Sequence, residues 1–196
     1  MSFWSRSGTY APSVTEETYQ ITTGFGNGVW NNCYDNNYDY QIIQSKAAVA
    51  GAGFYEGIAR IMKAHNFMIL VDVYGNVPYS DAMKGSSVPT PKYDKGLAIY
   101  QSLLREIDGG LASINAATVT TSNANKNIAT NDIMFKGDKT LWNKFGNTLK
   151  LKMLIHTYAV TAINKATEMG IINTNGFGFL GAGQDAAINP GYSGVD

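Results

Sequence analysis

Apolar residues that recur every three or four positions limit this chain more than any other feature of its sequence. The clearest example is a stripe made of Leu97, Tyr100, Leu104, Ile107 and Leu111. Such spacing places side chains on one face of an amphipathic helix. Residues 42–71 and 138–169 show the same period, whereas alternating strand patterns are scarce. The sequence therefore predicts an all-α fold built from long amphipathic helices.

The first periodic segment is interpreted as one strong helix over residues 42–71. Its apolar face consists of Ala47, Ala48, Phe54, Ile58, Ile61, Met62, His65 and Met68. Gly51, Gly53 and Gly57 each weaken a helix by about 1 kcal/mol relative to Ala. Small residues at that spacing also allow another helix to approach closely, so we expect a close helix contact here.

Capping residues mark the expected ends of the other two helices. Asp94 is the predicted N-cap of a helix of about 20 residues, and Asp138 is the predicted N-cap of a helix that runs to about Met169. Gly170 then suits a left-handed C-cap. The apolar face of this last helix contains Trp142, Phe145, Leu149, Met153 and Tyr158.

The segments between these helices are long. A short helix is expected at residues 29–41, a structured loop at 72–79 and a linker loop at 115–131. Helices that start near residues 42, 95 and 139 suggest helix pairs stacked in a solenoid, joined by long structured loops.

Charge and cysteine content exclude several classes of protein. The chain has 15 Lys and Arg against 15 Asp and Glu, so its net charge is zero. A nucleic-acid binder or an anionic-membrane binder needs a basic field. One cysteine excludes a disulfide framework and a cysteine-based zinc site. Asn, Gly, Ser and Thr provide much of the surface polarity, which suits contact with sugars or other neutral polymers.

The N-terminal residues 1–28 are polar and are interpreted as an arm, followed by a helical domain over residues 29–196. Met1 is not followed by the apolar region of a signal peptide, and Cys33 has no apolar run before it. We therefore do not expect Cys33 to be a lipid acceptor in the chain as it stands.

Two sequence patterns resemble known sites only by letter. The stretch from Gly176 to Gly181 matches G-x-G-x-x-G, but a helix precedes it where a dinucleotide site needs a strand. We interpret it as a flexible loop. Asp35, Asn37 and Asp39 alternate as in an EF-hand, yet the positions that require Gly and Glu do not hold them. A looser calcium site stays open as an alternative.

Catalytic and metal-binding groups are also weakly supported. His65 and His156 lie inside apolar helices, and neither has a companion ligand at helical spacing. Aspartates occur at predicted loop–helix junctions, where Asp usually accepts backbone N–H groups; they are Asp72, Asp81, Asp132 and Asp138. The sequence therefore predicts no enzyme, no cofactor and no metal site.

Aromatic and amide residues gather in residues 30–38. A sugar offers apolar faces that stack on Trp or Tyr, and hydroxyls that bond to Asn and Asp. Trp30, Asn31, Tyr34 and Asp35 are therefore the predicted ligand-contacting residues. The alternative is that Trp30 and Tyr34 pack a helix while the amides are solvated.

Several blocks of the sequence resemble the SusD/RagB family. Residues 71–82 are similar to its D-x-Y-G-D-V-P-Y-S-x-A signature, with Asn76 in place of the second Asp. Blocks at 91–104, 132–138 and 142–151 follow in the family's order and spacing. Together the blocks cover residue 30 to about residue 165, and weakly to 193. The motif positions read as architectural are Asp72, Tyr74, Gly75, Pro78, Tyr79, Trp142 and Phe145.

The resemblance implies tetratricopeptide-like helix pairs. It also implies a non-catalytic, lipid-anchored protein on the outer face of a Bacteroidetes-type outer membrane, which captures oligosaccharides for a TonB-dependent, SusC-like transporter. Family members are more than twice this length, so the chain is expected to be an incomplete SusD-like domain.

Two other functions remain open at this point. One is a peptide- or protein-interaction scaffold that uses the same helical surface without binding sugar. The other is an unrecognised hydrolase, although no pair of carboxylates in the sequence favours it.

Overall fold

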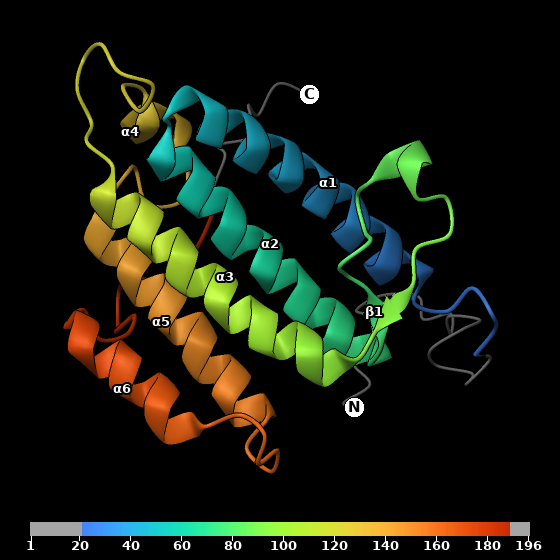
Figure 1. The fold of residues 1–196 in the computed structure, drawn as a ribbon. Coiled ribbons are helices and arrows are strands. Elements are labelled where there is room, and N and C mark those ends of the chain that lie inside the picture. The colour runs from blue at the N-terminus through green and yellow to red at the C-terminus, as the bar shows by residue number, and fades with distance from the viewer. Residues whose placement is uncertain (1–20, 189–196) are drawn as a thin grey trace, which may run out of the picture.

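The computed structural model describes residues 21–188. Its helices are α1 (Asn27–Ala50), α2 (Gly53–Tyr74), α3 (Gly96–Ala116), α4 (Ile128–Asn131), α5 (Lys139–His156) and α6 (Lys165–Asn175). Two short strands, β1 (Val77–Pro78) and β2 (Tyr93–Asp94), and a 3₁₀ turn, η1 (Gly85–Ser87), lie between α2 and α3. The five longer helices lie side by side in chain order (Figure 1). The predicted all-α, tetratricopeptide-like architecture is confirmed.

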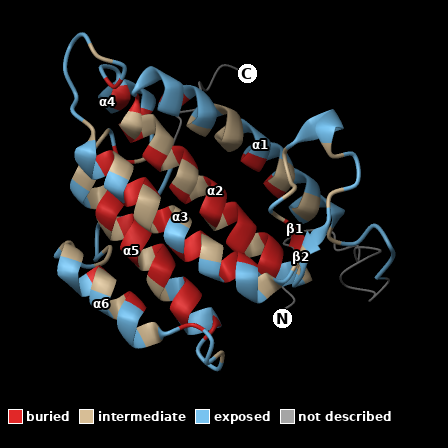
Figure 2. Ribbon diagram, viewed as in Figure 1, coloured by how far each residue is buried: buried red, intermediate tan, exposed pale blue. Residues whose placement is uncertain are grey.

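The core lies where α2, α3 and α5 meet, and Figure 2 shows buried residues concentrated there. On α3 the predicted stripe is buried at Tyr100, Leu104, Ile107 and Leu111. Leu97 is 40% exposed because α3 begins at Gly96, so Leu97 lies in the first turn, at the edge of the contact.

Two glycines bring α2 and α3 unusually close together. A Cβ atom on Gly57 would lie 2.4 Å from the Gly110 carbonyl oxygen, and one on Gly110 would lie 2.8 Å from the Gly57 carbonyl oxygen. Any larger side chain would force the helices apart. The expectation that Gly57 allows a close helix contact is confirmed.

The prediction of one helix over residues 42–71 is wrong, because the chain turns sharply at Gly51. Gly51 adopts a left-handed conformation with φ of 67°, and its N–H bonds back to the carbonyls of Ala47 and Ala48. Two antiparallel helices result. The helix expected at 29–41 is the first part of α1, which continues to Ala50. The apolar period continues across the break because the turn between α1 and α2 consists of only two residues, Gly51 and Ala52.

The predicted third helix is also two helices. It ends at His156, where the Thr157 hydroxyl donates to the Met153 carbonyl at 2.8 Å. Asn164 then caps α6 by accepting the Thr167 N–H at 3.1 Å. Tyr158 is consequently 81% exposed and does not join the core. The predicted C-cap at residue 170 lies inside α6, and Gly176 ends that helix instead.

One of the two predicted N-caps is correct. Asp138 accepts the Leu141 N–H at 3.0 Å at the start of α5. Asp94 does not cap α3, because it lies in β2 and its carboxylate accepts other backbone groups. The Asn76 side chain performs that role by accepting the Gly96 N–H at 3.0 Å.

The expected N-terminal arm at residues 1–28 lies mostly outside the described residues, and α1 begins at Asn27. Between residues 21 and 188, no helix combines the length and the apolar character that crossing a membrane requires.

Candidate functional site

The segment between β1 and β2, residues 79–92, forms a loop that we call the β1–β2 loop. The two strands pair antiparallel, with Val77 opposite Asp94 and Pro78 opposite Tyr93. The Asp94 carboxylate accepts the N–H groups of Tyr79 at 3.1 Å and Ser80 at 2.7 Å. These contacts fasten the start of the loop to its end.

The Asp94 carboxylate is held in its charged form. Partial desolvation, the largest single influence, acts to raise the pKa of Asp94. The hydrogen bonds from Ser80 and Tyr79, together with the charge of Lys92, outweigh it and lower the pKa. Asp94 therefore stays ionised and keeps accepting these hydrogen bonds near neutral pH.

Residues of the family-like motif tie this loop to the helices. The Tyr74 hydroxyl donates to the Gly26 carbonyl at 2.5 Å, ahead of α1. Gly75 ends α2 with φ of 76°, and the Pro78 carbonyl accepts the Tyr34 hydroxyl at 2.6 Å. The Tyr79 ring packs edge-on against Phe67, with centroids 4.8 Å apart. These motif residues hold the loop in place.

The remaining motif residues also stabilise helix contacts. Asp72 accepts the Tyr100 hydroxyl and lies 2.9 Å from Nδ1 of His156, which joins α2, α3 and α5. Trp142 is buried and donates its indole N–H to Asp132 at 2.7 Å. Its ring packs edge-on against Phe145, with centroids 5.7 Å apart.

The structure brings two of the four predicted ligand-contacting residues together. Trp30 and Tyr34 are one helical turn apart on α1, with ring centroids at 4.9 Å, and both are half-buried. With Pro78, Ala82, Met83 and Pro91 they line a cavity of about 190 Å³ beneath the β1–β2 loop. Asn31 and Asp35 are exposed on the neighbouring side of α1 and are not part of its lining.

Further aromatic rings extend this cluster. Trp30 stacks on Tyr93 at 6.3 Å and meets Tyr74 edge-on at 5.2 Å. Burial, with smaller contributions from Tyr93 and Asp94, raises the pKa of Tyr34, so its hydroxyl stays neutral and continues to donate to Pro78. The cluster thus presents apolar ring surface with polar groups at its edge.

A second cavity, of about 340 Å³, shares Ala82 and Met83 with the first. Its remaining lining is mostly polar and consists of Gln41, Lys63, Phe67, Tyr79, Ser80, Lys84 and Glu106. Met83 has a positive φ of 61°, which is uncommon for a residue other than glycine. The two cavities therefore flank one strained position of the β1–β2 loop.

Sequence reasoning missed the second cavity. The available signal was Lys63, a charged residue close to the apolar face of α2. Burial leaves it 9% exposed.

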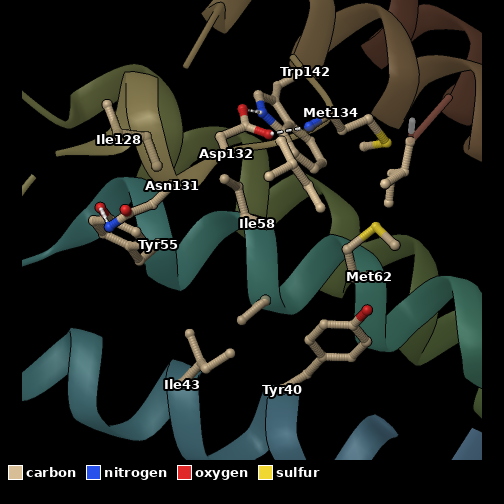
Figure 3. A pocket seen from close by; sticks show the side chains of 13 residues that line it. Tyr40, Ile43, Tyr55, Ile58, Met62, Ile128, Asn131, Asp132, Met134 and Trp142 are labelled. Atoms are coloured by element: carbon tan, nitrogen blue, oxygen red, sulfur yellow. Dashed lines mark hydrogen bonds between the residues drawn. The ribbon is translucent and has the colours of Figure 1, made fainter. Parts of the chain in front are cut away.

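A third cavity, of about 350 Å³, opens between α1 and α2 on one side and α4 and α5 on the other (Figure 3). Its wall is mostly apolar and includes Ile43, Ile58, Met62, Ile128, Ile133 and Met134. The polar groups at its edge already bond to each other, since Asn131 donates to the Tyr55 hydroxyl at 2.9 Å and Trp142 donates to Asp132. This cavity offers apolar contact above all.

The other candidate groups do not form a catalytic or metal centre in the described residues. No cluster of three or more His, Cys, Asp or Glu side chains occurs within residues 21–188. Burial raises the pKa of the Cys33 thiol. Burial, aided by Lys152, lowers the pKa of His65. Asp35 and Asp39 lie within the continuous helix α1, whereas an EF-hand needs a loop there.

The glycine-rich stretch that begins at Gly176 is also not a dinucleotide site. Gly176 is the C-cap of α6, with φ of 75°, and residues 177–181 have no regular structure. A dinucleotide site would need a helix to begin there.

Comparison with known proteins gives a consistent picture. A SusD-like family, described as starch-binding and associating with the outer membrane, matches residues 1–193. No curated protein is similar enough in sequence to match.

Solved structures of SusD homologues share the fold. One from Bacteroides fragilis is 29% identical, with a TM-score of 0.60 over 72% of this chain and 30% of that protein. A chitin-binding protein is 26% identical, with a TM-score of 0.65 over 83% of this chain and 34% of that protein. A SusD-like protein from Bacteroides thetaiotaomicron is 21% identical, with a TM-score of 0.69 over 82% and 32%. The chain spans about a third of the length of these structures.

Proposed function

The chain belongs to the SusD-like family, and we propose from this membership that it is part of an outer-membrane protein that captures oligosaccharides at the cell surface. The family description and a chitin-binding relative with the same fold support a glycan as ligand. In this proposal the protein is lipid-anchored, performs no chemistry and delivers its ligand to a TonB-dependent, SusC-like transporter.

The observation that carries the proposal within this chain is the aromatic cavity beneath the β1–β2 loop. Trp30 and Tyr34 offer half-buried ring faces beside a space of about 190 Å³. Apolar sugar faces stack on such rings, and exposed Asn31 and Asp35 on the same helix offer hydrogen bonds to hydroxyls. The bound sugar would lie between α1 and the loop.

Calorimetric titration with chitin- and starch-derived oligosaccharides tests this proposal. We expect binding that weakens about tenfold or more in Trp30→Ala, because an aromatic anchor is worth about 1–3 kcal/mol. Tyr158→Ala is the matched control, since Tyr158 is 81% exposed, follows α5 and lines no part of the cavity beneath the loop. Equal affinity of Trp30→Ala and the unaltered chain would contradict the assigned site, and no binding of any glycan would contradict the function.

A scaffold for peptides or proteins is the second candidate, favoured by the apolar cavity between α1 and α4. Exposed apolar surface marks many protein contacts, and Ile43 and Ile133 at this cavity are 42% and 53% exposed. Co-purification with a SusC-like barrel, without measurable affinity for sugars, would favour this function.

A further inference from the structure

We infer that the polar cavity beside the β1–β2 loop binds a carboxylate, and that the ligand is an acidic sugar such as a uronic acid. This inference rests on the proposed glycan-binding function and names the class of glycan. Its basis is the cation in the wall of the cavity, Lys63, together with the space next to it.

Among the described residues no carboxylate lies within ion-pair distance of Lys63, although the charge of Glu106 acts on it from farther away. Its Nζ atom donates to Oε1 of Gln41 at 2.8 Å and to Oε1 of Gln44 at 2.5 Å. Both partners are neutral amides, and none of the ion pairs within residues 21–188 includes Lys63. An ammonium has three N–H donors, so one remains for a further acceptor. Buried charges are ordinarily paired, because removing them from water is costly.

The other charged groups of the cavity wall already have partners. Glu106 lies 3.1 Å from Arg60, which Glu56 shares at 3.7 Å, and Lys84 lies 2.7 Å from Asp81. Lys63 is therefore the cation of this wall that no carboxylate of the described residues approaches within ion-pair distance. A carboxylate fits, since it would supply both the missing charge and the third acceptor.

The rest of the lining suits a sugar ring. Tyr79 and Gln41 present a hydroxyl and an amide, and Phe67 and Met83 add apolar surface. The space of about 340 Å³ borders the aromatic cavity at Ala82 and Met83. One sugar stacked on Trp30 and an acidic neighbour at Lys63 would therefore belong to the same oligosaccharide.

Two buried amides near Lys63 lack a hydrogen-bond partner among the described residues. Asn37 lies one helical turn before Gln41 on α1 and is fully buried, yet its side-chain amide bonds to no described residue. Asn66, one turn after Lys63 on α2, has a buried side-chain nitrogen in the same condition. The wall behind Lys63 therefore contains polar groups that the fold itself does not satisfy.

Matched pairs of oligosaccharides test the inference by calorimetry. We propose oligogalacturonides and their carboxyl-reduced, neutral counterparts, which differ only in the carboxylate. The chain should bind the acidic member about tenfold more tightly, as expected for a charge-assisted hydrogen bond. Lys63→Met should remove this preference and Lys63→Arg should retain it. Lys46→Met is the control, because Lys46 is exposed on the same helix pair.

Each outcome decides between the two proposals. Equal affinity for acidic and neutral sugars, with binding lost in Trp30→Ala, would overturn the acidic-sugar inference and leave glycan capture intact. No binding of either galacturonide, with chitin- or starch-derived sugars still bound, would overturn the inference alone, and no binding of any of these sugars would overturn both. A short peptide with a free C-terminal carboxylate forms the last arm: if it binds through Lys63 and its amidated form does not, while sugars fail, the ligand is a peptide and the inference is wrong.

Discussion

The contact between α1 and α2 and the contact among α3, α5 and α6 each bury a lysine, but they treat its charge in opposite ways. Lys150 on α5 is fully buried, and its Nζ atom lies 2.5 Å from Asp108 and 3.1 Å from Glu168. Lys63 on α2 meets the side-chain oxygens of Gln41 and Gln44. One lysine is neutralised within the fold, whereas the other retains an unneutralised charge beside a cavity.

The buried asparagines repeat the same difference. Asn143 on α5 donates to Asn115 on α3 at 2.7 Å and to the Lys139 carbonyl at 2.7 Å. Asn37 on α1 is equally buried and makes no such bond. Polar groups between α3 and α5 bond to each other, whereas the contact between α1 and α2 combines the bonds of Lys63 with a buried amide, Asn37, that has no partner in the described residues. The first contact is structural, and the second has the properties of a binding surface.

Removing Lys150 should produce the largest effect. Lys150→Met removes the buried cation that Asp108 and Glu168 share and leaves them only the half-exposed Arg105, so the cost should lie near the lower end of the about 3–5 kcal/mol of a broken buried ion pair. We expect a loss of that size in the free energy of unfolding, measured by urea denaturation. Lys63→Met is the matched variant and should change stability by less than about 1 kcal/mol, because it leaves only neutral amides behind. Equal losses in the two variants would remove the distinction between the two contacts.

The asparagines give the next largest difference. Asn143→Leu should lower the free energy of unfolding by about 1–3 kcal/mol, because it leaves Asn115 and a backbone carbonyl without their partner. Asn37→Leu should be neutral or stabilising, because it removes a buried amide that forms no bond. Parallel urea denaturation of the two variants measures both. If Asn37→Leu destabilised the chain as much as Asn143→Leu does, Asn37 would be structural as well.

The sequence was sufficient to predict the face that α3 buries, and insufficient to predict where helices end. Buried residues such as Ile107 and Leu111 can be predicted from neighbouring positions in the sequence, because burial follows the helical period. The turn at Gly51 is too short to interrupt that period, so the sequence pattern alone predicts one helix where the structure has α1 and α2. Capping at Asn164 was likewise masked by apolar residues on either side of it.

The candidate site was predictable only where its residues are close in the chain. Trp30 and Tyr34 lie one turn apart, so the sequence alone places them on one face. The environment of Lys63 depends on glutamines 19 and 22 residues away, on another helix. Asp94 was read as a helix cap because the groups that it binds, 14 and 15 residues earlier, become its neighbours only when β1 and β2 pair. Long-range partners of polar side chains have no local signature.

The smallest predicted effect is a pH dependence of the α1–α2 contact. Burial, together with Arg60, lowers the pKa of Lys63 from its usual 10.5, although Glu106 opposes this. Below the lowered pKa, Lys63 is charged in both the folded and the unfolded chain, and folding bears the full cost of burying that charge. Between the lowered pKa and 10.5 the unfolded chain binds more protons, so the free energy of unfolding rises with pH.

Comparison with Lys63→Met isolates this effect from the tyrosines. Burial raises the pKa of Tyr79 to about 12, so alkaline pH favours the unfolded chain above about pH 10. That loss is common to both proteins and cancels in their difference. Urea denaturation at increasing pH, up to about pH 10, should therefore show the unaltered chain gaining stability relative to Lys63→Met once the pH exceeds the lowered pKa of Lys63, and its preference for acidic sugars should weaken above the same point. A constant difference in stability would mean that the Lys63 charge costs the fold nothing, and the cavity would then have no need of an anion.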